Sequence, residues 1–155
     1  MDSVNSVVFQ PFSNHMCTCS GDKTISMWDC RTGLCIQTFY GHTNACNHAT
    51  FNLRGDCIAS TDADGIVKFW DVRMVSERLS VAVGQYPANK AAFDASCSIV
   101  AVGCEDGAIR IVDANEGRVL SSLTGHEDSV HCVAFDAAGQ FLVSCSSDGT
   151  ARLWS

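Results

Sequence analysis

The sequence predicts an all-β fold of four similar units, each a small antiparallel sheet of four strands. The main observation is a repeat of 42 residues, the interval between Asp22 and Asp64. An aspartate and a phenylalanine each recur at that interval, at Asp22, Asp64, Asp106 and Asp148 and at Phe9, Phe51, Phe93 and Phe135. Repeats of about 40–45 residues are typical of a β-propeller, in which such sheets form the blades. The expected repeats cover approximately residues 1–40, 41–83, 84–124 and 125–155.

The first strand of each unit is predicted to end at the recurring phenylalanine. These strands are expected at Val4–Phe9, Cys46–Phe51, Asn89–Phe93 and Val130–Phe135.

A turn rich in Gly, Asp and Asn comes next, and a second strand is expected near Ile58–Thr61 and Phe141–Cys145. The recurring aspartate then marks a tight hairpin, because the glycine after it accepts positive φ without steric cost. The dipeptides are Asp64-Gly65, Asp106-Gly107 and Asp148-Gly149, whereas Asp22-Lys23 departs from the pattern in its second residue.

Third strands are expected at Thr24–Trp28, Ile66–Trp70, Ala108–Val112 and Thr150–Trp154, and outer strands at Leu34–Phe39, Leu79–Val83 and Val119–Leu123. Only Ser155 follows Trp154, so the fourth unit has no outer strand of its own. From these ends we expect either the C-terminal part of a larger closed propeller or a short protein whose homodimer closes an eight-bladed ring.

The composition favours protein partners. The net charge is −7 and the ten Lys and Arg residues form no run, which argues against nucleic acid and anionic membranes. Apolar runs are too short to span a bilayer and no basic, apolar leader is present, so we expect a soluble cytoplasmic protein. The ten cysteines have irregular spacing and no Cys-x-x-Cys pair, which favours free thiols packed as small hydrophobes. We expect no metal and no cofactor.

Two dipeptide types recur in register with the repeats, namely Gly-His at Gly41-His42 and Gly125-His126 and Trp-Asp at Trp28-Asp29 and Trp70-Asp71. With these marks the chain resembles the WD-repeat (WD40) family of β-propellers over nearly its whole length. The resemblance implies a structural set of hydrogen-bonded side chains in each blade: His42, Ser60, Asp64 and Trp70; His126, Ser144, Asp148 and Trp154; and Thr18, Asp22 and Trp28 in the first unit.

The expected chain of hydrogen bonds runs from indole to hydroxyl to imidazole to carboxylate, which gives every buried polar group a partner. The third unit keeps only Asp106, with Val102 and Val112 where the hydroxyl and indole would be. Such a unit can still pack, because both partners have been replaced by apolar groups.

A hydrolase triad is the competing interpretation of His, Ser and Asp in one cluster. We disfavour it, because the serine falls in the middle of a strand with its hydroxyl engaged by tryptophan, and because the set repeats. We therefore expect no catalytic residue.

Candidate partner-binding residues follow from the alignment of the repeats. Asn47, Asn89 and His131 share one phase near the channel mouth, and His48 and Lys90 share the next. Glu105 precedes a turn aspartate, and Tyr86 is an aromatic residue in the loop that enters the third unit. Turn formation and strand capping by asparagine remain the simpler alternative for the Asn series.

Six stretches narrow the resemblance further: Gly33–Cys35, Gln37–His42, Asn44–Asn47, Ile58–Ser60, Val67–Arg73 and Tyr86–Lys90. They resemble the sperm-associated antigen type of WD-repeat protein in the central apparatus of motile cilia and flagella. That resemblance implies a non-catalytic scaffold that docks axonemal central-pair proteins. The alternative function is a regulatory adaptor, such as a ubiquitin-ligase substrate receptor or a peptide reader.

Overall fold

The computed structural model describes residues 2–155, which form four antiparallel sheets that we call blades one to four. Blade one contains β1 (Val4–Phe9), β2 (His15–Ser20), β3 (Ile25–Asp29) and β4 (Cys35–Phe39). Blade two contains β5 (Cys46–Phe51), β6 (Cys57–Asp62), β7 (Ile66–Asp71) and β8 (Ser76–Ala82). Blade three contains β9 (Ala88–Phe93), β10 (Ile99–Cys104), β11 (Ile109–Asp113) and β12 (Arg118–Leu123). Blade four contains β13 (Val130–Phe135), β14 (Leu142–Ser146) and β15 (Ala151–Trp154).

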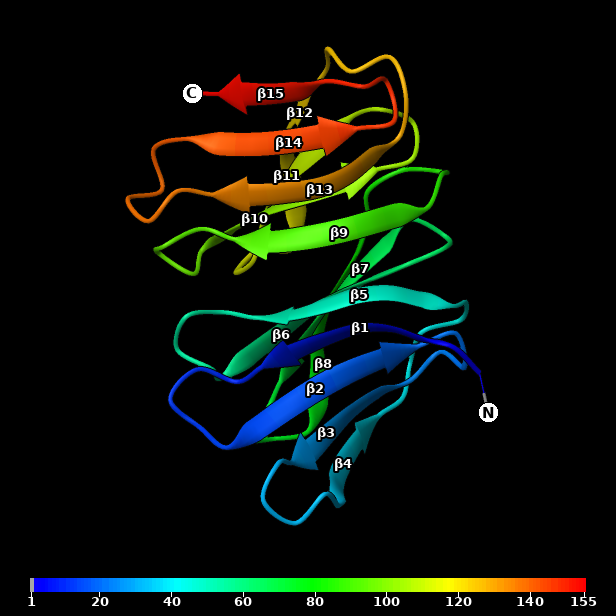
Figure 1. The fold of residues 1–155 in the computed structure, drawn as a ribbon, viewed down its shortest axis with the longest axis vertical. Helices are drawn as coiled ribbons and strands as arrows, with labels where there is room; N and C mark the ends of the chain where they lie inside the picture. Colours follow the sequence, from blue (N-terminus) through cyan, green and yellow to red (C-terminus); the bar gives the residue numbers. More distant parts are fainter. Residues whose placement is uncertain (1) are drawn as a thin grey trace.

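The strands of each blade pair in chain order, and the first strands of the four blades are neighbours. Figure 1 shows β1, β5, β9 and β13 next to one another in the middle of the molecule, with the later strands of each blade running outward. The N- and C-terminal ends lie at opposite sides of this row. The predicted all-β architecture of propeller blades is confirmed, and the four blades do not close into a ring. No helix long and apolar enough to cross a membrane occurs in residues 2–155.

The hairpins between second and third strands adopt the predicted backbone. Gly65, Gly107 and Gly149 have φ of 75°, 84° and 81°. Lys23 occupies the same turn position in blade one and takes a φ of 76° despite its side chain. The departure from Asp-Gly in blade one therefore changes the residue and leaves the turn conformation intact.

The strand starts agree with the predicted ones to within one residue except at β8, which begins three residues before the predicted Leu79. β8 begins at Ser76, because Asp71 Oδ1 accepts the amides of Arg73 and Met74 and closes a turn without glycine. β3 begins at Ile25, because the Thr24 amide and hydroxyl are held by Asp22 Oδ1 in the hairpin turn.

An apolar core fills each junction between neighbouring blades. Between blades two and three it includes Phe69, Val102 and Val112, which are all fully buried. Between blades one and two it includes the thiols of Cys17 and Cys19, which pack as small hydrophobes. All ten cysteines are free thiols. Since each blade buries a different face against each neighbour, the outward faces of blades one and four remain uncovered in this chain.

Candidate functional site: the polar sets and the inner groove

Blade two contains a buried chain of four polar side chains. Trp70 Nε1 donates to Ser60 Oγ at 2.8 Å, and the Ser60 hydroxyl lies 2.6 Å from His42 Nε2. His42 Nδ1 lies 2.7 Å from Asp62 Oδ2. Because a carboxylate only accepts, His42 donates from Nδ1 and its Nε2 accepts the serine proton. We call such a chain the polar set of a blade.

The expected carboxylate of this set, Asp64, is wrong. Asp64 is exposed and accepts from Thr43 Oγ1 and Asn44 Nδ2. Asp62 takes its place because it ends β6 directly beneath the turn, with its other oxygen accepting the amides of Asp64 and Ile66 at 3.0 Å each. A fully buried carboxylate with three donors leaves no position for a second one beside the imidazole.

In blade four the expected residues do come together. Trp154 Nε1 donates to Ser144 Oγ at 2.9 Å, Ser144 Oγ lies 2.7 Å from His126 Nε2, and His126 Nδ1 lies 2.8 Å from Asp148 Oδ2. The residue at the position of Asp62 is Ser146, whose hydroxyl accepts the Asp148 amide at 3.1 Å. The turn aspartate of this blade is therefore free to reach the imidazole.

Hydrogen bonding lowers the pKa of both carboxylates. Burial by itself raises the pKa of Asp62, but the donors His42, Ile66 and Asp64 outweigh it and the net pKa is below its ordinary value. For Asp148, the hydroxyl of Thr150 is the largest cause, and His126 also holds the pKa well below the usual range. Both carboxylates are thus ionised acceptors at neutral pH.

Blades one and three differ from this pattern in opposite ways. In blade one, Trp28 Nε1 donates to Thr18 Oγ1 at 2.9 Å, and no imidazole from residues 2–155 contacts Thr18 or Asp22. In blade three, Val102 and Val112 are fully buried, and the remaining Asp106 pairs with Arg110 at 2.7 Å. Blade one thus contains an incomplete polar set, whereas blade three has apolar residues at the same positions.

The serines of the polar sets are poorly placed for nucleophilic catalysis. Ser60 is fully buried and Ser144 is 1% exposed, and each hydroxyl is held between an indole and an imidazole. A substrate carbonyl could not reach either oxygen without displacing the tryptophan. These clusters hold the blades together.

The asparagine series connects neighbouring blades. Asn5 Nδ2 donates to the carbonyl of Cys46 at 2.8 Å, and Asn47 Nδ2 donates to that of Ala88 at 2.9 Å. Asn89 Nδ2 repeats the contact with Val130 O at 3.0 Å. These amides are therefore committed to the next blade, and a free recognition ring of Asn47 and Asn89 is not what the structure shows.

The other candidate partner residues are dispersed. Tyr86 is 57% exposed in the loop before β9, and Glu105 is exposed at the β10–β11 turn. His131 is exposed on β13, where Nε2 contacts Ser147 Oγ. Only His48 and Lys90 share a concave surface.

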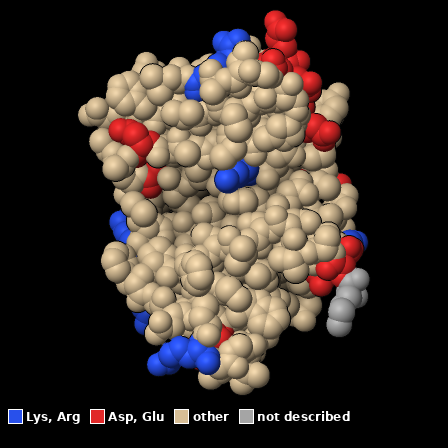
Figure 2. Space-filling model, viewed as in Figure 1, with Lys and Arg blue, Asp and Glu red and all other residues tan. Residues whose placement is uncertain are grey.

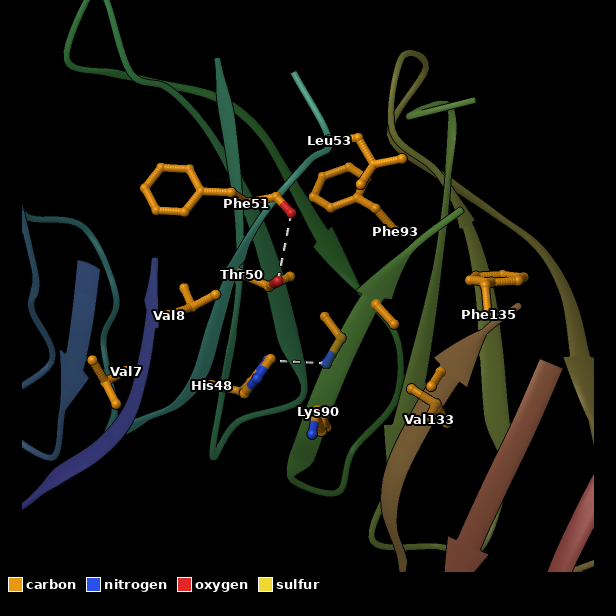
Figure 3. A pocket seen from close by; sticks show the side chains of 13 residues that line it. Val7, Val8, His48, Thr50, Phe51, Leu53, Lys90, Phe93, Val133 and Phe135 are labelled. Atoms are coloured by element: carbon orange, nitrogen blue, oxygen red, sulfur yellow. Dashed lines mark hydrogen bonds between the residues drawn. The ribbon is translucent and has the colours of Figure 1, made fainter. Parts of the chain in front are cut away.

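That surface, the inner groove, has a volume of about 440 Å³ and crosses all four first strands. Its lining includes the apolar side chains of Val7, Val8, Phe51, Leu53, Phe93, Val133 and Phe135, while polar atoms make up about half of its exposed surface. Figure 3 shows His48 and Lys90 from adjacent strands between these walls. Sequence reasoning missed the wall residues, because an apolar side chain on a strand is equally typical of the core.

Lys90 is the cation of this groove. It is half-buried and makes no ion pair with any residue in 2–155. His48 Nδ1 accepts the Ala91 amide at 3.4 Å, and burial, followed by the charge of Lys90, lowers the pKa of His48 to about 4. Figure 2 shows this face hollowed across its middle, with most charged side chains at the rim. The groove thus presents one positive charge and a neutral imidazole in apolar surroundings.

These blades define a β-propeller repeat protein, and the comparison with known families identifies the repeat family. The family model described as "WD domain, G-beta repeat" matches residues 1–29, 33–71 and 117–155. The chain belongs to the WD40 repeat family. Residues 72–116, which include most of blade three, lie outside the matched ranges.

Similar proteins have several different names. The chain is 32% identical over 164 residues to "Nuclear distribution protein PAC1" of Arthroderma benhamiae, covering 99% of this chain and 36% of that protein. It is 31% identical over 155 residues to "Periodic tryptophan protein 2" of Arabidopsis thaliana, covering 97% and 17%. It is 36% identical over 97 residues to "U3 small nucleolar RNA-associated protein 21 homolog" of Schizosaccharomyces pombe, covering 63% and 11%. The chain spans about a third or less of these relatives, and their names do not support the sperm-associated antigen type.

Proposed function

We propose that this chain is a non-catalytic protein-binding scaffold whose inner groove takes an extended peptide segment of a partner. The segment would carry a carboxylate flanked by apolar side chains. The observation that carries the proposal is the position of Lys90, which has no ion-pair partner among residues 2–155 and lies in a groove lined by several apolar side chains.

The charge distribution supports an acidic segment. Lys90 is the single charged residue of β1, β5, β9 and β13, in a chain whose net charge is −7. Low-dielectric walls strengthen the field of a cation, so a carboxylate placed beside Lys90 would bind more tightly than on an open surface. With Nδ1 of His48 accepting from Ala91, its Nε2–H is available as a second donor.

The apolar walls supply the remainder of the recognition. Leu53 is 57% and Val7 61% exposed, so both have surface left to bury against a partner. Each apolar side chain that becomes fully buried contributes about 1.5–3 kcal/mol before the cost of ordering the peptide. Apolar residues on both sides of the acid would therefore decide between peptides of equal charge.

A peptide array tests this function. Its eight-residue peptides have one central Glu, Gln or Lys, with either Leu or Ser at the flanking positions. We expect binding, measured by fluorescence anisotropy, only for peptides that combine Glu with Leu. Lys90→Met should weaken it about tenfold or more, since a charge-assisted hydrogen bond contributes about 1.5–3 kcal/mol.

Lys23→Met is the matched control, because it removes the same charge from an exposed turn of blade one. Equal losses in Lys23→Met and Lys90→Met would show that net charge, and not the groove, attracts the peptide. Binding that ignores the flanking residues would refute the groove as the recognition site.

A peptide-reading adaptor is the form of scaffold that Lys90 favours. Docking of axonemal central-pair proteins is the narrower hypothesis, and it is supported by the sequence stretches around Gln37–His42 and Tyr86–Lys90 alone. Localisation of the tagged full-length protein in ciliated cells separates the two, since a cytoplasmic or nuclear distribution without axonemal signal would exclude the ciliary role.

Pairing of two copies into an eight-bladed ring remains a prediction. The uncovered face of blade four has apolar side chains to bury, with Val143 46% and Leu153 67% exposed. Light scattering after size exclusion, repeated over a dilution series, should give twice the chain mass if the ring forms. A monomer at every concentration would rule the pairing out.

A further inference from the structure

Blade four places two cysteines directly opposite each other on neighbouring strands. Cys132 of β13 and Cys145 of β14 are partners in the antiparallel register. His131 is the extra residue of a β-bulge in β13, and this bulge sets the register that follows it. Without the bulge, Cys132 would lie opposite Ser144. One inserted residue therefore brings the two thiols together.

This pairing of thiols is particular to blade four. The equivalent facing pairs in the other three blades each contain at most one cysteine, and they are Ser6 with Cys19, His48 with Thr61 and Lys90 with Gly103. Across all the strand pairings of residues 2–155, Cys132 and Cys145 are the one pair of cysteines in register.

The register alone puts the two thiols within reach of a covalent bond. Directly opposite residues of antiparallel strands have Cα atoms about 4.5 or 5.5 Å apart, and disulfides span Cα distances of about 4.4–6.8 Å. The Cβ atoms of such a pair lie about 4.5–5.5 Å apart, whereas a disulfide needs about 3.5–4.5 Å. A small approach of β13 and β14 is thus enough, and the strand pairing is kept.

The pair lies on the face of blade four that is turned away from blade three. Val133 and Leu142 alternate with the two cysteines along their strands and are buried in the core with blade three. Cys145 is exposed and Cys132 is partly exposed. Val143, two residues before Cys145, shares this face and is 46% exposed. A small reagent in solution therefore reaches Cys145 first.

The thiols of the blade junctions differ from this pair. Cys17 is fully buried between blades one and two, and burial raises the pKa of its thiol to about 12. Burial likewise raises the pKa of Cys104 to about 11. Since the thiolate is the reactive form, these cysteines are inert beside the exposed ones.

We propose that Cys132 and Cys145 form a modification site at which hydrogen peroxide produces an intramolecular disulfide. The Cys145 thiolate attacks one peroxide oxygen, the O–O bond breaks, and Cys145 sulfenic acid forms as hydroxide leaves. The Cys132 thiolate then attacks the Cys145 sulfur, the S–S bond forms, and the sulfenic oxygen leaves as a second hydroxide. The two hydroxide ions take up the two thiol protons as water. The sulfurs are oxidised and the peroxide is reduced.

This site is independent of the inner groove and of the function proposed for it. The test uses the whole chain, first fully reduced and freed of reductant, then treated with equimolar hydrogen peroxide in the presence of dimedone, which traps sulfenic acids. Peptide mass spectrometry under non-reducing conditions should find the Cys132 and Cys145 peptides linked, with a mass lower by two hydrogen atoms. Dithiothreitol should separate them again.

The variant Cys132→Ser removes the resolving thiol and keeps the attacking one. Serine suits the position, because Ser6 is the equivalent residue of blade one. We expect the Cys145 sulfenic acid to persist in this variant and to carry dimedone, whereas the wild type should show little adduct at Cys145. Thermal unfolding gives a second readout, because a crosslink that restricts the unfolded chain should raise the Tm of the oxidised wild type and not that of the variant.

Cys35 is the internal control for the reagent. It is exposed and lies opposite Trp28, so it has no thiol partner across the strand. Its sulfenic acid should therefore be trapped by dimedone equally in the wild type and in Cys132→Ser.

Three outcomes would overturn the proposal. One is equal dimedone labelling of Cys145 in the wild type and in Cys132→Ser, which would show that Cys132 does not resolve the sulfenic acid. Another is an unmodified Cys145 in samples whose Cys35 is labelled. The third is a doubled chain mass under non-reducing conditions with Cys145 linked to Cys145, which would assign this thiol to a contact between two copies.

Discussion

Blades two and three have the same strand order and adjoin the same junction, yet they are held by different forces. Blade two carries a complete polar set in which Trp70 and Ser60 are buried with partners. Blade three has Val112 and Val102 at the same positions, with no polar group to satisfy. The family model matches blade two as far as the end of β7 and omits most of blade three. The fold tolerates either solution because the members of the polar set pair with one another, whereas the valines at the same positions have no polar group to pair.

The comparison implies that a blade with only part of the polar set is less stable than a blade with either the complete set or apolar residues in its place. A blade with an indole and no acceptor, or with a hydroxyl and no indole, leaves a buried group unsatisfied at a cost of about 1–3 kcal/mol. Substitutions that move one blade partway toward the other should therefore cost more than the volume change alone suggests.

The largest expected effect is that of Trp70→Ala. It opens a cavity in the blade-one to blade-two core and also removes the donor to Ser60. We expect a loss of about 3–5 kcal/mol in the free energy of unfolding. Val112→Ala is the matched change in blade three and should cost about 1–3 kcal/mol, since fewer atoms are removed and no partner is stranded. Urea unfolding followed by circular dichroism measures both, and equal losses would contradict the distinction between the blades.

The next largest effect is expected when one side chain of the polar set of blade two is placed at the equivalent position in blade three. Val102→Ser puts a hydroxyl into blade three, where Val112 offers no indole and the surroundings are apolar. We expect it to cost about 2–4 kcal/mol, from lost apolar burial and an unpaired hydroxyl together.

The double variant Val102→Ser with Val112→Trp indicates whether the unpaired hydroxyl causes that cost. The added indole could pair with the serine, so part of the loss should be recovered if the larger ring is accommodated. The same cycle in blade two, Ser60→Val with Trp70→Val, should show the same sign of coupling. Purely additive losses in both cycles would mean that pairing of indole and hydroxyl contributes nothing.

The sequence was sufficient for the architecture because the repeat length and the Asp-Gly turns both describe local geometry. The resemblance to the WD-repeat family also placed His126, Ser144, Asp148 and Trp154 together, and the structure confirms this set. It failed at Asp62, where two carboxylates two residues apart compete for one imidazole and the outcome depends on depth of burial. A signal was available, because the equivalent positions Ser20 and Ser146 both cap the turn with a side-chain oxygen.

The inner groove was only half predictable for a related reason. His48 and Lys90 stood out as polar residues in a regular pattern, but the roles of Asn47 and Asn89 depended on which carbonyl of the next blade lay within reach. Contacts between repeats cannot be deduced from the pattern within one repeat. The apolar walls likewise become a groove only through the angle between neighbouring blades.

A smaller effect should distinguish the carboxylates of blades two and four. Asp62→Asn weakens the acceptor for His42 and should cost about 1–3 kcal/mol. Asp64→Asn, which changes an exposed carboxylate at the same turn, should cost less than about 0.5 kcal/mol. In blade four the turn aspartate, Asp148, is the residue that accepts from the histidine. Asp148→Asn should therefore be destabilising, although Asp148 aligns with Asp64 and not with Asp62. Thermal unfolding of the three variants decides the point, and a large loss in Asp64→Asn would contradict the assignment of Asp62.

The last effect, which appears only below about pH 6.5, contrasts two histidines of blade two. His42 has polar partners at both ring nitrogens, whereas His48 has one polar partner, the Ala91 amide. His48 also lies beside Lys90 in the inner groove. The pKa of His48 is lowered to about 4 by burial and then by Lys90, below the reference value of about 6.5 for an unfolded chain. Because the unfolded state binds the proton first, the contribution of His48 to stability is present above about pH 6.5 and declines as the pH falls toward about 4. Subtracting the pH dependence of His48→Gln from that of the wild type isolates this contribution.

Lys90→Met removes one of the two causes, so the pKa of His48 should rise, by less than the full difference from the reference value because burial persists. An NMR titration of the His48 ring protons measures the change directly, with Lys23→Met as a control of equal charge. A pKa that moves equally in both variants would show that Lys90 acts on His48 only through net charge. A selective rise would establish that the two side chains share one low-dielectric site, which is the property that the inner groove needs in order to hold an anionic peptide.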